Sequence, residues 1–179
     1  MKKFIISIDA GTTSNRSILF DLKGKPIYSS QKEFTQFFPK SGWVEHNPEE
    51  IWRTTLKTLK DVIQKAKSLR GQILSIGITN QRETTLAWRK SSGEPLHNAL
   101  VWQDTRTQDI CDELKQMEEI KDEFIKTGLP VATYFSLSKI LWLIRNVDEV
   151  QIAKNENDIC FGTVDSWPVS YTHLRAHET

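Results

Sequence analysis

The chain begins with two apolar runs that each end in an aspartate, separated by a short connector of small and hydroxyl-bearing residues. The stretch IDAGTTSNRSILFD, residues 8–21, is typical of a strand, a tight turn and a second strand. A Gly-Lys-Ser/Thr phosphate loop or a dinucleotide-binding loop with three spaced glycines would require a helix after the turn. A strand follows here instead, so the sequence predicts an N-terminal β-hairpin that starts a sheet.

Patterns further along the chain predict a mixed α/β sheet with flanking helices. A third strand is expected over 27–34, and Asn47-Pro48-Glu49-Glu50 predicts the capped start of a helix that ends at Gly71. Its apolar stripe has helical spacing and comprises Ile51, Thr55, Leu59, Val62 and Ala66. Further strands are expected over 73–79, 84–88, 96–102 and 159–165. Two further helices are expected, one with Ile110, Cys111, Leu114 and Met117 on a single face and one capped by Ser136.

Length and charge narrow the classes of protein. A chain of 179 residues is long enough for one domain, and no linker or repeat divides residues 1–167. Lysine plus arginine (24) nearly equals aspartate plus glutamate (23), which argues against a nucleic-acid partner. No apolar run approaches the length of a membrane span. Cys111 and Cys160 lack metal-ligand spacing, so we expect reduced thiols in a cytoplasmic protein. His46 and His97 are isolated and receive no role.

The connector of the hairpin is a candidate phosphate site. The hydroxyls of Thr12, Thr13 and Ser14, the backbone N–H groups and Arg16 could together donate hydrogen bonds to phosphate oxygens. Asp9 would then stand where a magnesium ion bridging phosphates needs a carboxylate or its bound water. The alternative is a solvated hairpin loop, which this pattern alone favours.

Two further groups could bind a polyol. Arg82 and Glu83 are a donor and an acceptor that could hold neighbouring hydroxyls and keep each other charged, although a surface ion pair is the commoner meaning of such a pair. The rings of Trp102 and Tyr134 could pack against the C–H side of a polyol. The alternative is that they are core aromatics, as we expect for Trp52, Trp88 and Trp142.

Five segments taken together carry a resemblance. In order along the chain, they are IDAGTTSNRSILFD, PKSGWVEHNPEEIW, IGITNQRETTLAW, NALVWQDTRT and FGTVDSW. They resemble the N-terminal domain of the FGGY carbohydrate kinases, and within that family they are most similar to the members that phosphorylate glycerol. The resemblance covers residues 3–167, and five ordered segments argue against a structural domain without a site.

The resemblance implies a fold, substrates and roles for the candidate residues. The fold would be a ribonuclease-H-like lobe of the actin and hexokinase type, incomplete in this chain. The activity would be transfer of the γ-phosphoryl group of ATP, with Mg²⁺, to glycerol, giving sn-glycerol 3-phosphate. Arg82, Glu83 and Tyr134 would hold glycerol hydroxyls and Trp102 would lie against its carbons. The ATP phosphates would meet the turn residues Thr12, Thr13, Ser14 and Arg16, with Asp9 near the magnesium. The full-length parent would be a homo-oligomer.

Two departures from the family pattern bear on activity. Ala10 replaces a glutamine that many members carry. This change should be tolerated beside the turn because the alanine side chain is small. Residues 168–179, PVSYTHLRAHET, match nothing in the family, and we interpret them as a disordered foreign tail on a truncated reading frame. The family's base is an aspartate in a Gly-Asp-Gln-Gln segment expected beyond residue 179, so this chain alone should be inactive. Two other functions stay open, namely an FGGY kinase for another acceptor such as a pentulose or gluconate, and a non-catalytic ATPase-fold binding module.

Overall fold

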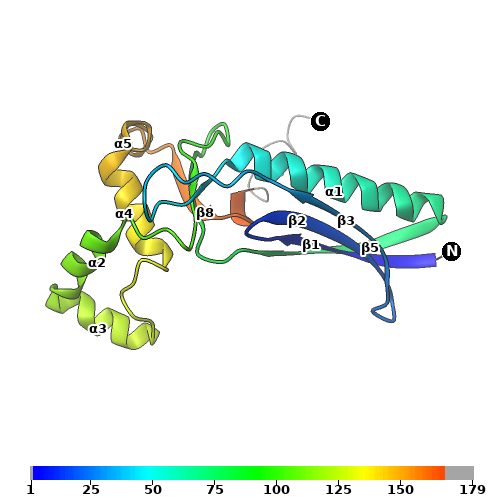
Figure 1. Ribbon diagram of the computed structural model, residues 1–179, viewed down its shortest axis with the longest axis horizontal. Coiled ribbons are helices and arrows are strands. Elements are labelled where there is room, and N and C mark those ends of the chain that lie inside the picture. Colours follow the sequence, from blue (N-terminus) through cyan, green and yellow to red (C-terminus); the bar gives the residue numbers. More distant parts are fainter. Residues whose placement is uncertain (1, 168–179) are drawn as a thin grey trace. The chain divides into compact units, whose positions relative to one another are not determined.

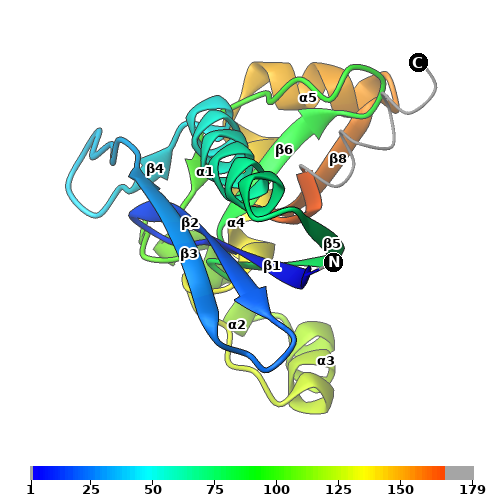
Figure 2. The same cartoon turned by 90° about the vertical axis from the view of Figure 1, so that its right-hand side faces the viewer.

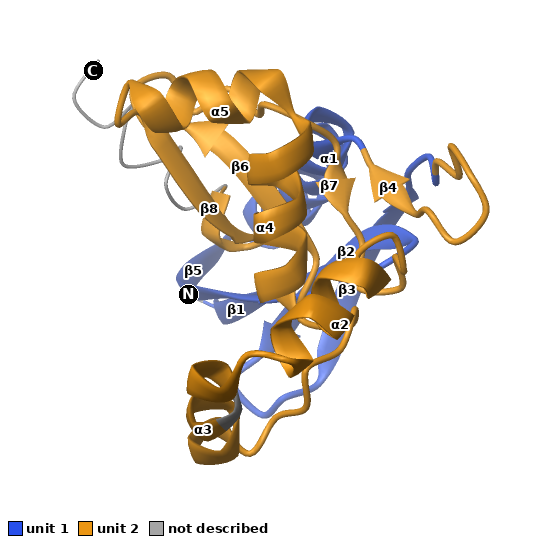
Figure 3. Cartoon of the chain, turned by 90° about the vertical axis from the view of Figure 1, so that its left-hand side faces the viewer, with its two compact units in different colours: residues 1–36, 47–81 blue, residues 37–46, 82–179 orange. Residues whose placement is uncertain are grey.

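The computed structural model describes residues 2–167, apart from the side chain of Lys121. It divides into two compact units, one formed by residues up to 36 together with 47–81, and the other by residues 37–46 together with those from 82 onward (Figure 3). The chain changes from one unit to the other within stretches that the sequence marks as motifs, so no linker separates the two units. The predicted foreign tail lies outside the described residues.

The first unit is built on a four-stranded sheet (Figure 1). Its strands are β1 (Lys2–Ala10), β2 (Ser14–Asp21), β3 (Pro26–Glu33) and β5 (Gly71–Asn80), in the order β3-β2-β1-β5. β1 and β2 are antiparallel, with Asp9 opposite Arg16, and β5 runs parallel to β1. The predicted hairpin is therefore confirmed, and it delivers its turn to the end of the sheet at which β1 and β5 both finish.

Helix α1 (Pro48–Ser68) covers one face of this sheet. The Asn47 side chain accepts a hydrogen bond from the Glu50 N–H, Pro48 occupies the first turn, and Glu49 and Glu50 complement the positive end of the helix dipole. The core between helix and sheet consists of Phe4, Ile6, Ile8, Leu19, Val62 and Ala66, with Leu59 packed against it. Burying each large apolar side chain contributes about 1.5–3 kcal/mol.

A polar seam fixes the helix to the strand that follows the turn. The buried Asn15 amide donates to the Ile51 carbonyl at 2.9 Å and to the Thr54 hydroxyl at 2.6 Å. The hydroxyls of Ser17 and Thr58 lie 2.9 Å apart, also buried. Because these bonds have few competitors inside the core, they fix the register of α1 along β2 and so the position of the turn.

The second unit carries a smaller sheet in the order β4-β7-β6-β8. Its strands are β4 (Glu45–His46), β7 (Ala99–Leu100), β6 (Thr85–Arg89) and β8 (Ile159–Thr163). The helices are α2 (Gln108–Lys115), α3 (Glu118–Thr127), α4 (Ser136–Asn146) and α5 (Asp148–Asn155). Helices α4 and α5 pack on the sheet, α5 alongside β6 and β8 (Figure 2), over a core of Ala87, Leu100, Leu143, Val147 and Val150.

Several sequence predictions about elements were wrong, among them the helix end at Gly71, which instead begins β5, and the helix face reaching Met117, which lies after the end of α2. The strand expected over 96–102 is reduced to Ala99–Leu100, and just before it the chain meets β6 only at an isolated antiparallel bridge between Trp88 and Pro95. Ser136 is the first residue of α4 and not its cap, since the N-cap position is Phe135. Trp88 is buried and the partly buried Trp142 packs against the core of the second unit, as predicted, whereas Trp52 is only partly buried.

Candidate functional site

The turn between β1 and β2 is closed by a backbone hydrogen bond from Gly11 N–H to the Ser14 carbonyl, 3.1 Å long. A Cβ atom on Gly11 would stand 3.0 Å from that carbonyl oxygen, tighter than nearly all real contacts, so glycine allows this closure. Thr13 is exposed, and Thr12 and Ser14 are half-buried. The three hydroxyls are thus gathered within one tight turn.

The carbonyl groups of this turn are all engaged by other protein groups. The side-chain amide of Gln81 donates to the Gly11 carbonyl and that of Gln36 to the Thr12 carbonyl, each at 3.1 Å. The Thr13 carbonyl accepts from the Phe34 N–H at 3.3 Å. These carbonyl oxygens, which would repel an anion, therefore already accept hydrogen bonds from the protein. The turn can then present its donor groups to a phosphate. The sequence did not single out Gln36 or Gln81, and only the proximity of Gln81 to Arg82 could have suggested it.

Gln31, on β3, connects two of the predicted phosphate residues. Its amide nitrogen donates to the Ser14 hydroxyl at 2.9 Å, and its oxygen accepts from Arg16 Nε at 2.9 Å. Ser14 and Arg16 lie on the same face of β2, because residues two apart in a strand point the same way. The structure therefore brings Ser14 and Arg16 together, and Gln31 is a contact that sequence reasoning missed.

Asp9 is the carboxylate that the sequence predicted to support a magnesium ion. It is exposed at the end of β1, and within residues 2–167 no hydrogen bond or ion pair engages its carboxylate. No group of three or more histidine, cysteine or acidic side chains that could hold a metal occurs among the described residues. A Mg²⁺ ion here would therefore depend on one carboxylate, water and substrate phosphates, a ligand set that this ion commonly accepts.

The predicted polyol residues belong to the second unit, whereas the phosphate turn belongs to the first. Glu83 has a left-handed backbone, with φ 67°, which costs a non-glycine residue about 1–2 kcal/mol. Its carboxylate accepts from the Ser136 N–H at 2.9 Å and the Ser136 hydroxyl at 2.8 Å. The Glu83 carboxylate therefore caps α4, although Glu83 itself lies outside that helix. A strained backbone conformation such as that of Glu83 occurs most often at functional sites.

Arg82 does not pair with Glu83, which corrects the sequence interpretation. Arg82 is exposed, and its guanidinium has no protein partner within the described residues. The reason is geometric, because the left-handed residue sends the Glu83 carboxylate to the helix end. Arg82 thus keeps all its donors available for a ligand, while Glu83 has one carboxylate oxygen, Oε2, engaged.

The structure brings Trp102 and Tyr134 together. Their ring centroids are 5.6 Å apart with planes at 61°, an edge-on contact. Tyr134 is 41% exposed and Trp102 half-buried, so neither is the fully buried core aromatic that the alternative required. The backbone N–H of Trp102 donates to the hydroxyl of Thr84 at 3.2 Å, and Thr84 follows Glu83 in sequence. Three of the four predicted residues, Glu83, Trp102 and Tyr134, are therefore linked through contacts within this unit.

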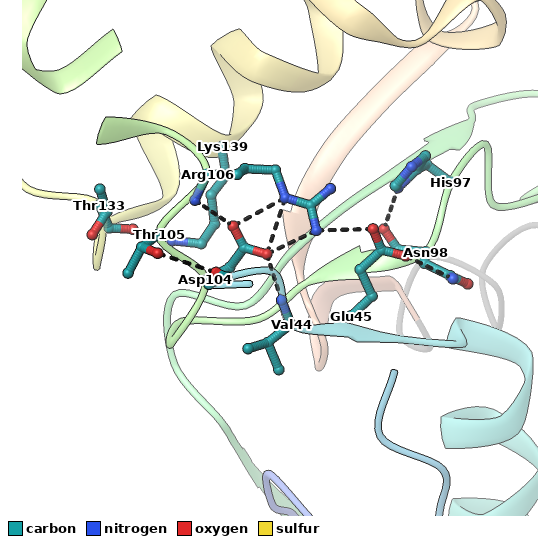
Figure 4. Close-up of polar contacts among 10 residues, drawn as sticks. Val44, Glu45, His97, Asn98, Asp104, Thr105, Arg106, Thr133 and Lys139 are labelled. Atoms are coloured by element: carbon teal, nitrogen blue, oxygen red, sulfur yellow. Dashed lines mark hydrogen bonds and ion pairs between the residues drawn. The ribbon is translucent and has the colours of Figure 1, made fainter. Parts of the chain in front are cut away.

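The second unit also contains a buried ionic cluster (Figure 4). The fully buried Arg106 side chain donates to Asp104 and to Glu45, each at 2.8 Å. Its guanidinium carbon stands 3.7 Å from the centroid of Trp43 and 4.7 Å from that of Trp142. Asp104 also accepts from the Val44 N–H at 2.7 Å. This cluster joins the segments GWVEH and WQDTR, which the sequence marked as separate motifs without indicating that they meet.

Burial lowers the pKa of His46 from 6.5 to about 4. The residue is completely buried on β4, beside Glu45. Its imidazole is therefore neutral at physiological pH. It is enclosed within the second unit.

The sequence and the fold are similar to those of known proteins. Residues 4–170 match the family model described as the FGGY family of carbohydrate kinases, N-terminal domain. A glycerol kinase of Bacillus cereus is 49% identical over 169 residues, which is 94% of this chain and 34% of that protein. The structure is similar to that of Plasmodium falciparum glycerol kinase with ADP, with a TM-score of 0.86, 34% identity, and coverage of 94% of this chain and 34% of that one.

A second solved structure, gluconate kinase from Lactobacillus acidophilus, is similar with a TM-score of 0.79 and 25% identity, over 93% of this chain and 32% of that one. The chain thus spans about a third of the length of the relatives that it matches. No helix in the described residues has the length and apolarity needed to cross a membrane.

Proposed function

We propose, because this chain belongs to the FGGY family of carbohydrate kinases, that it is the N-terminal part of a glycerol kinase. The reaction would transfer the γ-phosphoryl group of ATP to a terminal hydroxyl of glycerol. That hydroxyl oxygen forms a bond to the γ-phosphorus, the bond to the bridging oxygen breaks, and ADP and sn-glycerol 3-phosphate result. The observation that carries the proposal is the 49% identity to a glycerol kinase, together with the contacts that link Glu83, Trp102 and Tyr134.

The proposed roles of the candidate residues differ by substrate. Arg82 would donate to glycerol hydroxyls, the remaining capacity of the Glu83 carboxylate would accept from them, and Tyr134 would donate its phenol. Trp102 would cover the carbon side of the acceptor. In the first unit, Thr12, Thr13, Ser14 and Arg16 would bind nucleotide phosphates, with the turn carbonyls held away by Gln36 and Gln81.

Magnesium, held through Asp9 and water, would neutralise charge on the phosphates. The base that takes the acceptor proton would come from a part of the enzyme that this chain does not include. Both described cysteines are free thiols, which supports the cytoplasm as the compartment. The full-length enzyme would be a homo-oligomer.

The acceptor can be tested in a chimera. Residues 1–167 of this chain would replace the matching segment of the Bacillus cereus glycerol kinase, and ADP release would be measured with glycerol, xylulose and gluconate. We expect glycerol to give the highest kcat/KM. A preference for xylulose or gluconate would instead support the alternative acceptor class.

The role of Arg82 can be tested in the same chimera with a substitution and a matched control. Arg82→Gln removes the charge-assisted donors and should lower kcat/KM for glycerol about 100-fold, the effect of losing roughly 3 kcal/mol of transition-state binding. Arg89→Gln is the control, because Arg89 pairs with Glu156 and Asp158 elsewhere in the same unit. Equal effects of the two substitutions would remove Arg82 from the site.

A further inference from the structure

Lys139, on the first turns of α4, is a buried cation without an ionic partner. Its side chain is fully buried, and it forms no ion pair within residues 2–167. Burial lowers its pKa from 10.5 to about 8. Because burying an ammonium group is costly unless it donates hydrogen bonds, the contacts of Lys139 are informative.

The Lys139 ammonium binds the backbone just before α4. It donates to the carbonyl of Thr133 and, at 3.3 Å, to that of Tyr134. These residues lie between α3 and α4, outside any helix or strand. Figure 4 shows Lys139 reaching toward Thr133, on the side of Asp104 away from Glu45. A single buried cation thus fixes two consecutive peptide groups of an irregular segment.

A carboxylate holds the chain two residues after Tyr134, at the start of α4. Glu83 accepts from the N–H and the hydroxyl of Ser136. The hydroxyl of Ser138, one residue before Lys139, lies 2.9 Å from that of Thr107, and both residues are buried. Tyr134 has its carbonyl bound by Lys139 and lies two residues before Ser136, whose N–H is bound by Glu83. The exposed Tyr134 ring contacts Trp102.

We propose that Lys139 is a positioning residue of the acceptor site, which fixes the Thr133–Tyr134 backbone so that the Tyr134 ring stays against Trp102. Lys139 itself does not touch the acceptor. Its significance for glycerol binding rests on the function proposed above, whereas its effect on the aromatic pair does not.

The charges around Lys139 give this role a pH dependence. Asp104, Cys111 and Glu83 favour the charged ammonium, whereas Arg106 opposes it, and burial outweighs them. As the pH rises through about 8, the group loses a proton and its hydrogen bonds to two carbonyls lose their charge assistance. The contact between Tyr134 and Trp102 should loosen over the same pH range.

The test uses the 179-residue chain labelled with 5-fluorotryptophan, because the indole ring itself does not titrate near pH 8. The ¹⁹F resonance of Trp102 is assigned from Trp102→Phe. We expect this resonance to shift with a midpoint near pH 8. In Lys139→Met the shift with pH should vanish and the resonance should resemble that of the unsubstituted chain at high pH.

Two controls make the result specific. Lys154→Met removes an exposed lysine from α5 and should leave the titration unchanged. Cys111→Ala should keep the titration, with a somewhat lower midpoint because Cys111 favours the charged ammonium; loss of the titration in this variant would assign it to the thiol instead. A Trp102 resonance that is independent of pH in the unsubstituted chain, or that titrates equally in Lys139→Met, would overturn the proposal. The first of these observations needs no substitution and holds even if Lys139→Met fails to fold.

Glycerol added to the same samples separates the two proposals. We expect the glycerol concentration that half-saturates the Trp102 shift to rise several-fold between pH 7 and pH 9.5, and to be high at both pH values in Lys139→Met. If Trp102 follows the titration of Lys139 but never responds to glycerol, the positioning role holds and the acceptor assignment fails.

Discussion

At the scale of single residues, the second unit holds several ionisable groups out of water, and each is stabilised differently. Arg106 has two carboxylates and two indole rings around it, whereas Lys139 has backbone carbonyls. For His46 the pKa shift has burial as its cause. Protonation of His46 would replace its buried neutral ring with a buried imidazolium.

The chain should lose stability in mild acid through His46. Its pKa is about 4 in the folded chain and 6.5 when unfolded, so between these values only the unfolded state binds the proton. The free energy of unfolding therefore falls as the pH drops from 6.5 to 4, by roughly 3 kcal/mol in total. Urea unfolding at pH 7 and pH 4.5 measures the change.

His46→Gln should flatten this dependence, even if it lowers stability at pH 7. His97→Gln is the matched control, because His97 is only half-buried and contacts the Asn98 carbonyl. The interpretation fails if His46→Gln loses as much stability between the two pH values as the unsubstituted chain.

At the scale of elements, local patterns were enough for most strands and for α1, because alternation and capping are properties of neighbouring residues. The start of α4 shows the limit of that reasoning. Ser136 has the chemistry of a cap, but Glu83, 53 positions earlier, supplies the capping carboxylate. Likewise Gln31 and Gln81 act on the phosphate turn across the sheet, and no local spacing announces such contacts.

The two edges of the larger sheet differ in protection. β3 starts with a proline and ends in Lys32 and Glu33, devices that discourage further strand pairing. β5, with the sequence GQILSIGITN, has neither a charge nor a proline, and Leu74, Ile76 and Ile78 are 40–49% exposed. The β5 edge is therefore the element most prone to pair with a second copy.

We expect the 179-residue chain to self-associate at micromolar concentration, and Ile76→Lys to shift it toward monomer, because a charge on the edge opposes strand addition. Sedimentation velocity measures the distribution. The control is Ile27→Lys on the protected β3 edge, which should leave association unchanged. A monomeric unsubstituted chain at 100 µM would contradict this expectation.

At the scale of the whole molecule, family membership could be predicted from five ordered segments, whereas the division into two units could not. The reason is that residues 37–46 fold with the chain after residue 82, and such a return leaves no mark in local composition. The chain spans about a third of its relatives and contains no Gly-Asp-Gln sequence. Under the proposed function, this chain would therefore contribute substrate contacts, and the base that completes phosphoryl transfer would come from elsewhere in the enzyme.

The most direct test compares ADP release, dependent on glycerol, by the 179-residue chain and by its chimera with the remaining part of the Bacillus cereus enzyme. We predict glycerol-dependent turnover by the chimera and none above background by the chain alone, although both contain the same turn and the same acceptor residues. Turnover by the chain alone would contradict the account, as would a folded chimera that releases no ADP with glycerol.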